Sequence, residues 1–135
     1  MSNNAIRRRT RRYAPWSFAA LLAFATASWA ESEFDMDLMQ TVDDTSKELV
    51  SNLSLEDAAS ADGNLADLDA LLAQVETHYS AKGGADDAVK ITQDARALLV
   101  QIHEHIGAGD FETANLKQSE FSRNCKACHK LYKKS

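Results

Sequence analysis

Five consecutive residues near the C-terminus bring together two thiols and an imidazole: Cys125-Lys126-Ala127-Cys128-His129. Cys-x-x-Cys-His is the attachment sequence of c-type haem. Each thiol of such a sequence can add across one haem vinyl group, and the adjacent histidine can then bind the iron as an axial ligand. Cys-x-x-Cys alone also occurs in zinc sites and in dithiol oxidoreductases, so the rest of the chain must distinguish these chemistries.

The chain has two cysteines, and both lie in this motif. A disulfide between them is a rival use if the protein is exported to an oxidising compartment. Tetrahedral zinc would be one ligand short unless a remote histidine contributed. We therefore expect one covalently bound haem c with its iron, attached through Cys125 and Cys128 with His129 as the proximal ligand. A haem-free dithiol or metal-binding bundle is the remote alternative.

Residues 1–30 have the layout of a Sec signal peptide. They contain five arginines between positions 7 and 12, an apolar stretch from Trp16 to Trp29, and small residues before the cleavage point expected at Glu31. A twin-arginine signal is disfavoured, because Tyr13-Ala14-Pro15 lacks the apolar pair usual after the arginines. The apolar stretch is too short to span a bilayer and no second one follows, so we expect no stable membrane insertion.

Cleavage at that point leaves residues 31–135, which fit one small domain and are too few for a multi-domain enzyme. The signal peptide takes 5 of the 15 basic residues and none of the 20 acidic ones, so the formal charge of the mature chain is about −10. This charge disfavours nucleic acid as a partner. The expected location is the periplasm of a Gram-negative bacterium.

Nothing after residue 30 favours strands, because the single proline of the chain is Pro15 and clusters of β-branched residues are absent. Apolar residues instead recur at spacings of three and four, the pattern of amphipathic helices. Four such segments with short connections predict an all-α fold, an antiparallel four-helix bundle with the covalent haem site at its C-terminal end. Cofactor sites of such bundles lie between facing helices.

Capping residues and glycines set the expected ends of the four helices. The expected segments are 32–53, 54–79, 86–107 and 110–132. Their expected N-capping residues are Ser32, Ser54 within a capping box, Asp86 or Asp87, and Asp110. Gly63 weakens the second helix and could break it, whereas Gly83 and Gly107 mark helix ends.

Each expected helix carries one inward stripe of mostly apolar residues. The four stripes are Phe34, Leu38, Val42, Thr45, Leu49 and Leu53; Leu65, Leu68, Leu71, Leu72 and Val75; Val89, Ile91, Ala95, Leu98, Leu99, Ile102 and Ile106; and Phe111, Ala114, Gln118, Phe121, Cys125, Cys128 and Tyr132. Because the last stripe includes Cys125 and Cys128, both thiols are predicted to face the interior of the bundle.

These features together resemble the class II cytochromes c, the family of cytochrome c prime and its low-spin relatives. In that family the haem-binding sequence lies at the C-terminal end of a four-helix bundle. Cys125 and Cys128 match the family's thioether cysteines, His129 its proximal ligand, Tyr132 an aromatic position and Lys133 the basic residue that follows. The resemblance implies a monohaem protein, and a homodimer formed through the first helix is common among its members.

In low-spin members of the family a methionine on the first helix supplies the sixth iron ligand. The chain offers Met36 and Met39 there, and we favour Met39 because it lies farther inside the helix, whereas helix ends fray. Core filling is the ordinary role of a methionine on an apolar stripe, so an open distal side stays as the alternative. His78, His103 and His105 are expected at the surface.

The sequence therefore predicts an electron carrier and not an enzyme: a periplasmic cytochrome whose haem iron passes single electrons between periplasmic or membrane-bound redox proteins. If no side chain fills the sixth position, the resemblance implies a five-coordinate protein that binds nitric oxide or carbon monoxide. Basic residues concentrate in the last helix, where they either stabilise its C-terminus or form a docking patch for acidic partners.

Overall fold

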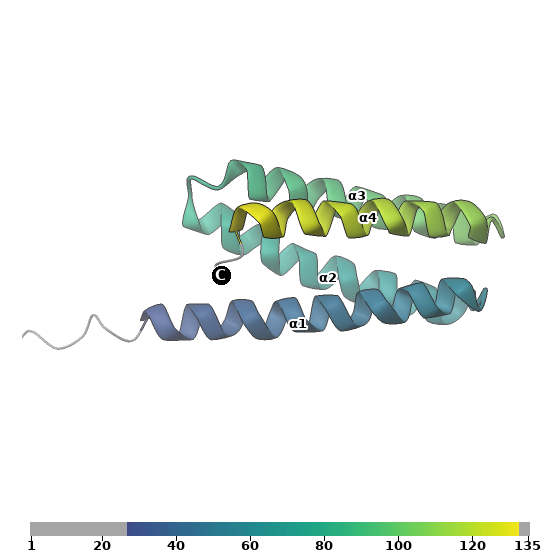
Figure 1. The fold of residues 1–135 in the computed structure, drawn as a ribbon, viewed down its shortest axis with the longest axis horizontal. Coiled ribbons are helices and arrows are strands. Elements are labelled where there is room, and N and C mark those ends of the chain that lie inside the picture. The colour runs from purple at the N-terminus through teal and green to yellow at the C-terminus, as the bar shows by residue number, and fades with distance from the viewer. Residues whose placement is uncertain (1–26, 133–135) are drawn as a thin grey trace, which may run out of the picture.

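The computed structural model describes residues 27–132, with side chains from Met36 onward. Most of the expected signal peptide and Lys133 therefore lie outside the described residues, as does the side chain of Phe34. Within residues 27–132 the chain forms four helices and no strands: α1 (Ala27–Ser54), α2 (Ala58–Lys82), α3 (Asp86–Gly107) and α4 (Phe111–Tyr132) (Figure 1). The predicted all-α class is confirmed for this part. None of the described helices is long and apolar enough to cross a membrane.

Consecutive helices run antiparallel and pack side by side, α1 on α2, α2 on α3 and α3 on α4, and α4 returns to α1 (Figure 1). The interface between α1 and α4 is the smallest of the four. In Figure 1, α1 diverges from α4 toward the end of the bundle where α4 terminates. The axis of α1 is therefore farther from that of α4 near the Cys-x-x-Cys-His segment than near the α1–α2 turn.

The core is built from the predicted stripes. Its largest fully buried side chains, at least one from each helix, are Leu49, Leu53, Leu68, Ile102 and Phe121. Burying a side chain of this size contributes about 1.5–3 kcal/mol. Polar residues also enter the core, since Thr92 and Gln118 are buried; Thr92 donates to the carbonyl of Ala88 at 2.8 Å and Gln118 to the hydroxyl of Ser122 at 3.1 Å.

Two predicted ends in the first half of the chain are wrong. Ser32 is not an N-cap, because α1 begins at Ala27 and passes through it. The capping box at Ser54 does not form, because burial of Leu53 keeps α1 helical through Ser54, whose hydroxyl donates to the carbonyl of Val50 at 2.8 Å. Asp57 caps α2 instead, accepting from the backbone N–H of Ser60 at 3.1 Å.

The remaining ends match the sequence more closely. Gly83 ends α2 at a positive φ of 71°, and Asp110 caps α4 by accepting from the backbone N–H of Thr113 at 3.0 Å. The expected cap of α3 is wrong, because the N-cap position is Ala85, which makes no side-chain capping bond. The helix α2 runs without a break through Gly63.

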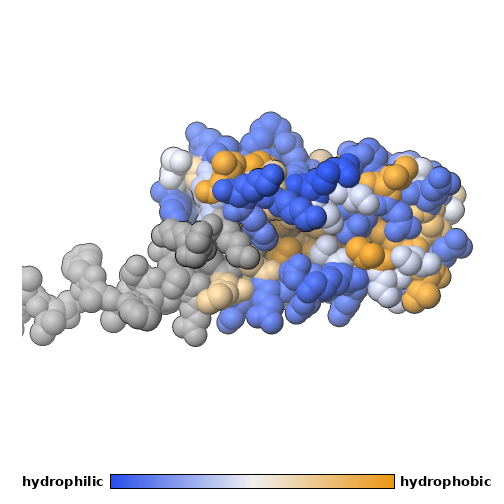
Figure 2. Space-filling view, in the orientation of Figure 1, coloured by the Kyte–Doolittle hydropathy of each residue, from blue (hydrophilic) through white to orange (hydrophobic). Residues whose placement is uncertain are grey.

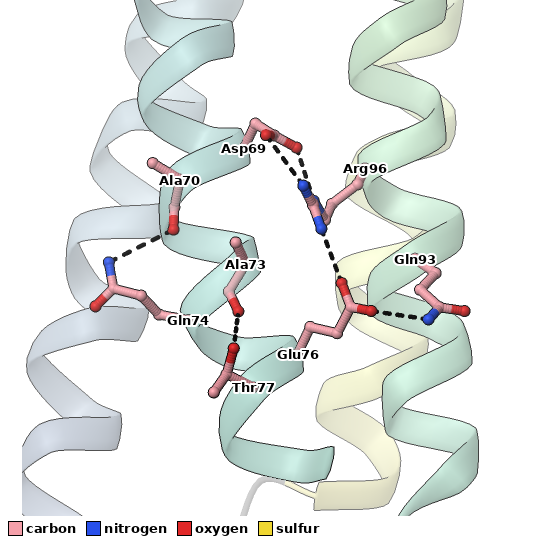
Figure 3. Close-up of polar contacts among 8 residues, drawn as sticks. All are labelled: Asp69, Ala70, Ala73, Gln74, Glu76, Thr77, Gln93 and Arg96. Atoms are coloured by element: carbon pink, nitrogen blue, oxygen red, sulfur yellow. Dashed lines mark hydrogen bonds and ion pairs between the residues drawn. The ribbon is translucent and has the colours of Figure 1, made fainter. Parts of the chain in front are cut away.

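Charged residues connect α2 to α3 on their outer side (Figure 3). The guanidinium of Arg96 donates twice to the carboxylate of Asp69, at 2.7 and 3.2 Å, and once to Glu76 at 2.9 Å. The second Glu76 oxygen accepts from Gln93 at 2.8 Å. These hydrogen bonds lower the pKa of Asp69 and of Glu76 and raise that of Arg96, so all three groups are charged at neutral pH.

Candidate functional site

The two thiols of the motif lie one turn apart on α4. Both cysteines are free and half-buried, and Cys125 packs against the core cluster that contains Phe121. Their predicted inward orientation is thus confirmed, although neither thiol is fully enclosed. A helix that turns about 100° per residue brings residues i and i+3 to nearly the same side, so both sulfurs face one region.

The charged groups near each thiol show which helices lie around the two sulfurs. The pKa of Cys125 is raised to about 11, chiefly by burial and further by the adjacent Cys128 and by Asp43 on α1. Burial also raises the pKa of Cys128, with Asp87 on α3 as a second cause. Both thiols are therefore protonated at neutral pH, whereas the reactive cysteines of dithiol oxidoreductases have a lowered pKa.

His129 is exposed and lies at the edge of α4 that faces α1. Measured around the axis of α4 from Cys128, which is near α3, Cys125 lies at about 60° and His129 at about 100° in the same direction. Since Cys125 is near Asp43 of α1, the further rotation carries His129 past it in the direction of α1. The imidazole therefore lies beside the opening between α1 and α4, next to the two sulfurs.

A recess separates α4 from α1 on this side of the molecule. Figure 2 shows apolar side chains at its floor, between a hydrophilic rim over α4 and another over α1. This is the side on which the helices make their smallest interface. The two half-buried thiols and the exposed imidazole of His129 thus offer sulfur and nitrogen donors on the last turns of α4, the helix that forms one rim of this recess.

Met39 lies at the level of the motif across this recess. Asp43 is near enough to raise the pKa of Cys125 electrostatically, and because α1 and α4 run antiparallel, one turn back from Asp43 to Met39 corresponds to one turn forward from Cys125 to Cys128 and His129. Met39 is half-buried, whereas Met36 is 69 % exposed. The side-chain environment thus agrees with the preference for Met39 over Met36.

Aromatic side chains close the end of the bundle beside Cys128. The hydroxyl of Tyr132 donates to the carboxylate of Asp87, which raises the pKa of Tyr132 to about 12. The ring of Tyr132 contacts Tyr79 of α2 with centroids 5.1 Å apart, and His78 meets Tyr79 edge-on at 5.2 Å. Sequence reasoning identified Tyr132 and considered Asp87 only as a helix cap, because its partner lies 45 residues away.

Whereas His78 belongs to this aromatic group, His103 and His105 pair with acidic residues elsewhere in the bundle. His103 contacts Asp62 at 2.8 Å and His105 contacts Asp110 at 3.2 Å, both through Nδ1. Among residues with described side chains, no group of three or more His, Cys, Asp or Glu side chains could hold a metal ion.

The sulfur and imidazole donors are therefore one local set on the last turns of α4, and the groups facing them come from all three other helices. Comparison of the chain with protein-family models, curated proteins and solved structures finds no match.

Proposed function

We propose that the chain is a periplasmic monohaem c-type cytochrome that carries single electrons between redox proteins. The observation that carries this proposal is the placement of Cys125, Cys128 and His129 on the last turns of α4, at the edge of an apolar recess. The order of two thiols and an imidazole is that of a covalent haem site. The signal-peptide layout of residues 1–30 supports export. The raised pKa of the Cys125 thiol disfavours a role as a reactive thiolate and so agrees with an attachment role.

The donor set fits the group. Each thiol can add its S–H across one vinyl double bond, with sulfur joining one carbon and hydrogen the other, so no oxidant or reductant is consumed. Two free thiols on one side of α4 suit two such bonds, and the imidazole of His129 suits iron. When bound, haem supplies reversible one-electron chemistry at its iron.

The residues of the chain hold and shield that group in distinct ways. Cys125 and Cys128 would anchor it to α4, and His129 would bind its iron. Buried Phe121 and the leucines of the core exclude water, which favours the less charged ferrous state. The contact of Tyr132 with Asp87 ties the last turn of α4 to α3, so the motif is held on a fixed element.

The sixth ligand divides the proposal into two functions. If Met39 coordinates, its soft thioether sulfur stabilises ferrous iron and raises the reduction potential, as suits an electron carrier. The small α1–α4 interface favours a second candidate, a five-coordinate protein that binds nitric oxide or carbon monoxide, because α1 is not packed firmly against α4 at this level. The role of Met39 distinguishes the two.

The first test is the mass and the visible spectrum of the full chain expressed with haem-maturation machinery. We expect a gain of one haem, absent when Cys125→Ser and Cys128→Ser are combined. His129→Ala should change the absorption bands, whereas the control His103→Ala, on α3, should not. A colourless protein of unmodified mass would refute the proposal and favour the haem-free alternative.

Carbon monoxide then separates the two candidates. Sharp low-spin bands that carbon monoxide does not move, lost in Met39→Ala and kept in Met36→Ala, would establish ligation by His129 and Met39. A high-spin spectrum that shifts with carbon monoxide in the parent protein would instead establish an open distal side and a gas-binding function.

A further inference from the structure

The outer face of α4 near its C-terminus carries three cationic side chains around an apolar depression. Its lining residues are Arg123, Lys126, Ala127, Lys130 and Leu131, and its volume is about 440 Å³. All five are exposed, Leu131 by 62 %. Their spacing of three and four residues puts them on one side of the helix. We name this set the α4 basic face.

The cations of the α4 basic face are not neutralised within the described chain. Arg123, Lys126 and Lys130 take part in none of its ion pairs, whereas Lys47 pairs with Asp43 at 2.6 Å and Lys90 with Asp94 at 2.7 Å. The whole chain has a formal net charge of −5. The face is thus a local positive region on an acidic protein.

The α4 basic face points outward from the bundle, whereas the half-buried thiols are on the inward part of α4. Ala127, near its centre, is about 100° around the helix from Cys128 and about 160° from Cys125. One helix, about 10 Å thick with its side chains, therefore separates a molecule on this face from the sulfurs. Lys126 lies on the flank of the face that is turned toward the recess.

We propose that the α4 basic face is the docking surface for an acidic patch on a protein redox partner, with an apolar side chain of the partner in the depression. The redox role of that partner rests on the proposed function. An apolar centre with a charged rim is the usual anatomy of such interfaces, and arginine is enriched in them. Unpaired cations facing an acidic patch accelerate association and orient the partner.

An anionic membrane fits this surface less well than a protein does. On the side of the molecule shown in Figure 2, α1 runs alongside α4. The helix α1 carries exposed acidic residues, among them Asp37, Asp43 and Asp44. A flat anionic surface that approached α4 would also meet these carboxylates, whereas an acidic patch of limited extent would not. The charge distribution therefore favours a protein partner.

The test compares two triple variants with the same change in charge. One neutralises the α4 basic face (Arg123→Gln, Lys126→Gln and Lys130→Gln). The control neutralises cations on the other three helices (Lys47→Gln, Lys82→Gln and Lys90→Gln). Ferrous haem-loaded protein is oxidised by hexacyanoferrate(III) in stopped flow; one electron leaves the iron and reduces the complex to hexacyanoferrate(II). A short polyglutamate peptide carrying one tryptophan competes for the surface.

At low ionic strength the peptide should slow oxidation of the parent and the control at least about threefold, and that of the α4 variant less than about 1.5-fold. High salt should abolish the difference. Equal slowing of all three proteins, or none, would overturn the proposal. The proposal would also be overturned if the parent bound phosphatidylglycerol vesicles but not the peptide, and if that vesicle binding required the same three cations.

A second readout separates this proposal from the proposed function. Amide NMR shifts caused by the peptide, followed with and without haem, should centre on residues 123–131 in the parent and be lost in the α4 variant. If the chain never acquires haem but shows these shifts, the proposed function fails while the docking surface stands. If it acquires haem and shows no such shifts, the reverse holds.

Discussion

Replacing two glycines of α2 by alanine should change stability in opposite directions. Gly63 lies inside the helix with no atom within 4 Å of an added Cβ, so Gly63→Ala adds no clash. Alanine loses less conformational freedom than glycine on entering a helix, which stabilises by about 0.5–1 kcal/mol. Gly83 also has free space around an added Cβ, but its φ of 71° and ψ of 153° define a region open essentially to glycine. Gly83→Ala should therefore destabilise by about 1–3 kcal/mol.

Urea unfolding followed by circular dichroism measures both changes against the parent protein. The midpoints should move in opposite directions with unchanged slopes, giving a difference in unfolding free energy of about 1.5–4 kcal/mol between the two variants. Because free space is the same at both positions, backbone conformation is the variable that differs. Shifts of the same sign would refute the continuous helix at Gly63 or the positive φ at Gly83.

Three further predictions concern the Arg96–Asp69 ion pair, the core and the last turn of α4. Arg96→Met with Asp69→Asn in a double-mutant cycle should show a coupling of about 1 kcal/mol at pH 7, an upper value for a half-exposed pair. Arg96 lowers the folded-state pKa of Asp69, so the stabilisation by this ion pair is present above the ordinary pKa of 3.8 and is lost as pH falls through the lowered pKa. Urea unfolding at pH 7 and pH 2 checks that the coupling disappears at the lower pH. Phe121→Ala should lower stability by about 3–5 kcal/mol in the same assay, and a loss below 1 kcal/mol would contradict its full burial. Tyr132→Phe removes the hydrogen bond to Asp87, so hydrogen exchange of the last turn of α4 should accelerate while that of the α1–α2 turn is unchanged.

Much of the fold could be predicted because the core stripes depend on local periodicity. Leu49, Leu68 and Ile102 were assigned inward positions from spacing alone, and all three are fully buried. Helix ends were less predictable, since Ser54 and Asp57 are both good capping residues three positions apart. Burial of Leu53 decides between them by extending α1 through Ser54. The apolar stripe predicted the burial of Leu53 but not how far α1 continues beyond it.

The continuity of α2 at Gly63 has a similar cause. A glycine inside a helix costs about 1 kcal/mol relative to alanine, and the next residues recover more than that. Asn64 is buried and bonds to Asn52 at 2.6 Å and to Glu48 at 3.2 Å, while Leu65 enters the core. Tertiary packing against α1 thus holds the helix together where its intrinsic propensity is weakest.

The acidic residues of α2 carried a signal that could have been used. Asp62, Asp69 and Glu76 recur every seven residues, which puts them on one side of the helix. In the structure all three face α3, where they meet His103 or Arg96. Heptad spacing of acids next to a helix with basic residues therefore predicts an interhelical seam, where a solvated surface would show no such period.

The two sides of the candidate site differ in how far sequence can define them. Cys125, Cys128 and His129 lie within five residues of one helix, so their relative placement follows from helix geometry alone. The distal side depends on how closely α1 approaches α4, and that interface is the smallest in the bundle. Few packing contacts oppose a small movement of α1 there, so a bond from Met39 to iron would itself add a constraint that the protein packing does not supply. Under the proposed function, the choice between electron carrier and gas binder would depend on the α1–α4 approach and not on the Cys-x-x-Cys-His motif.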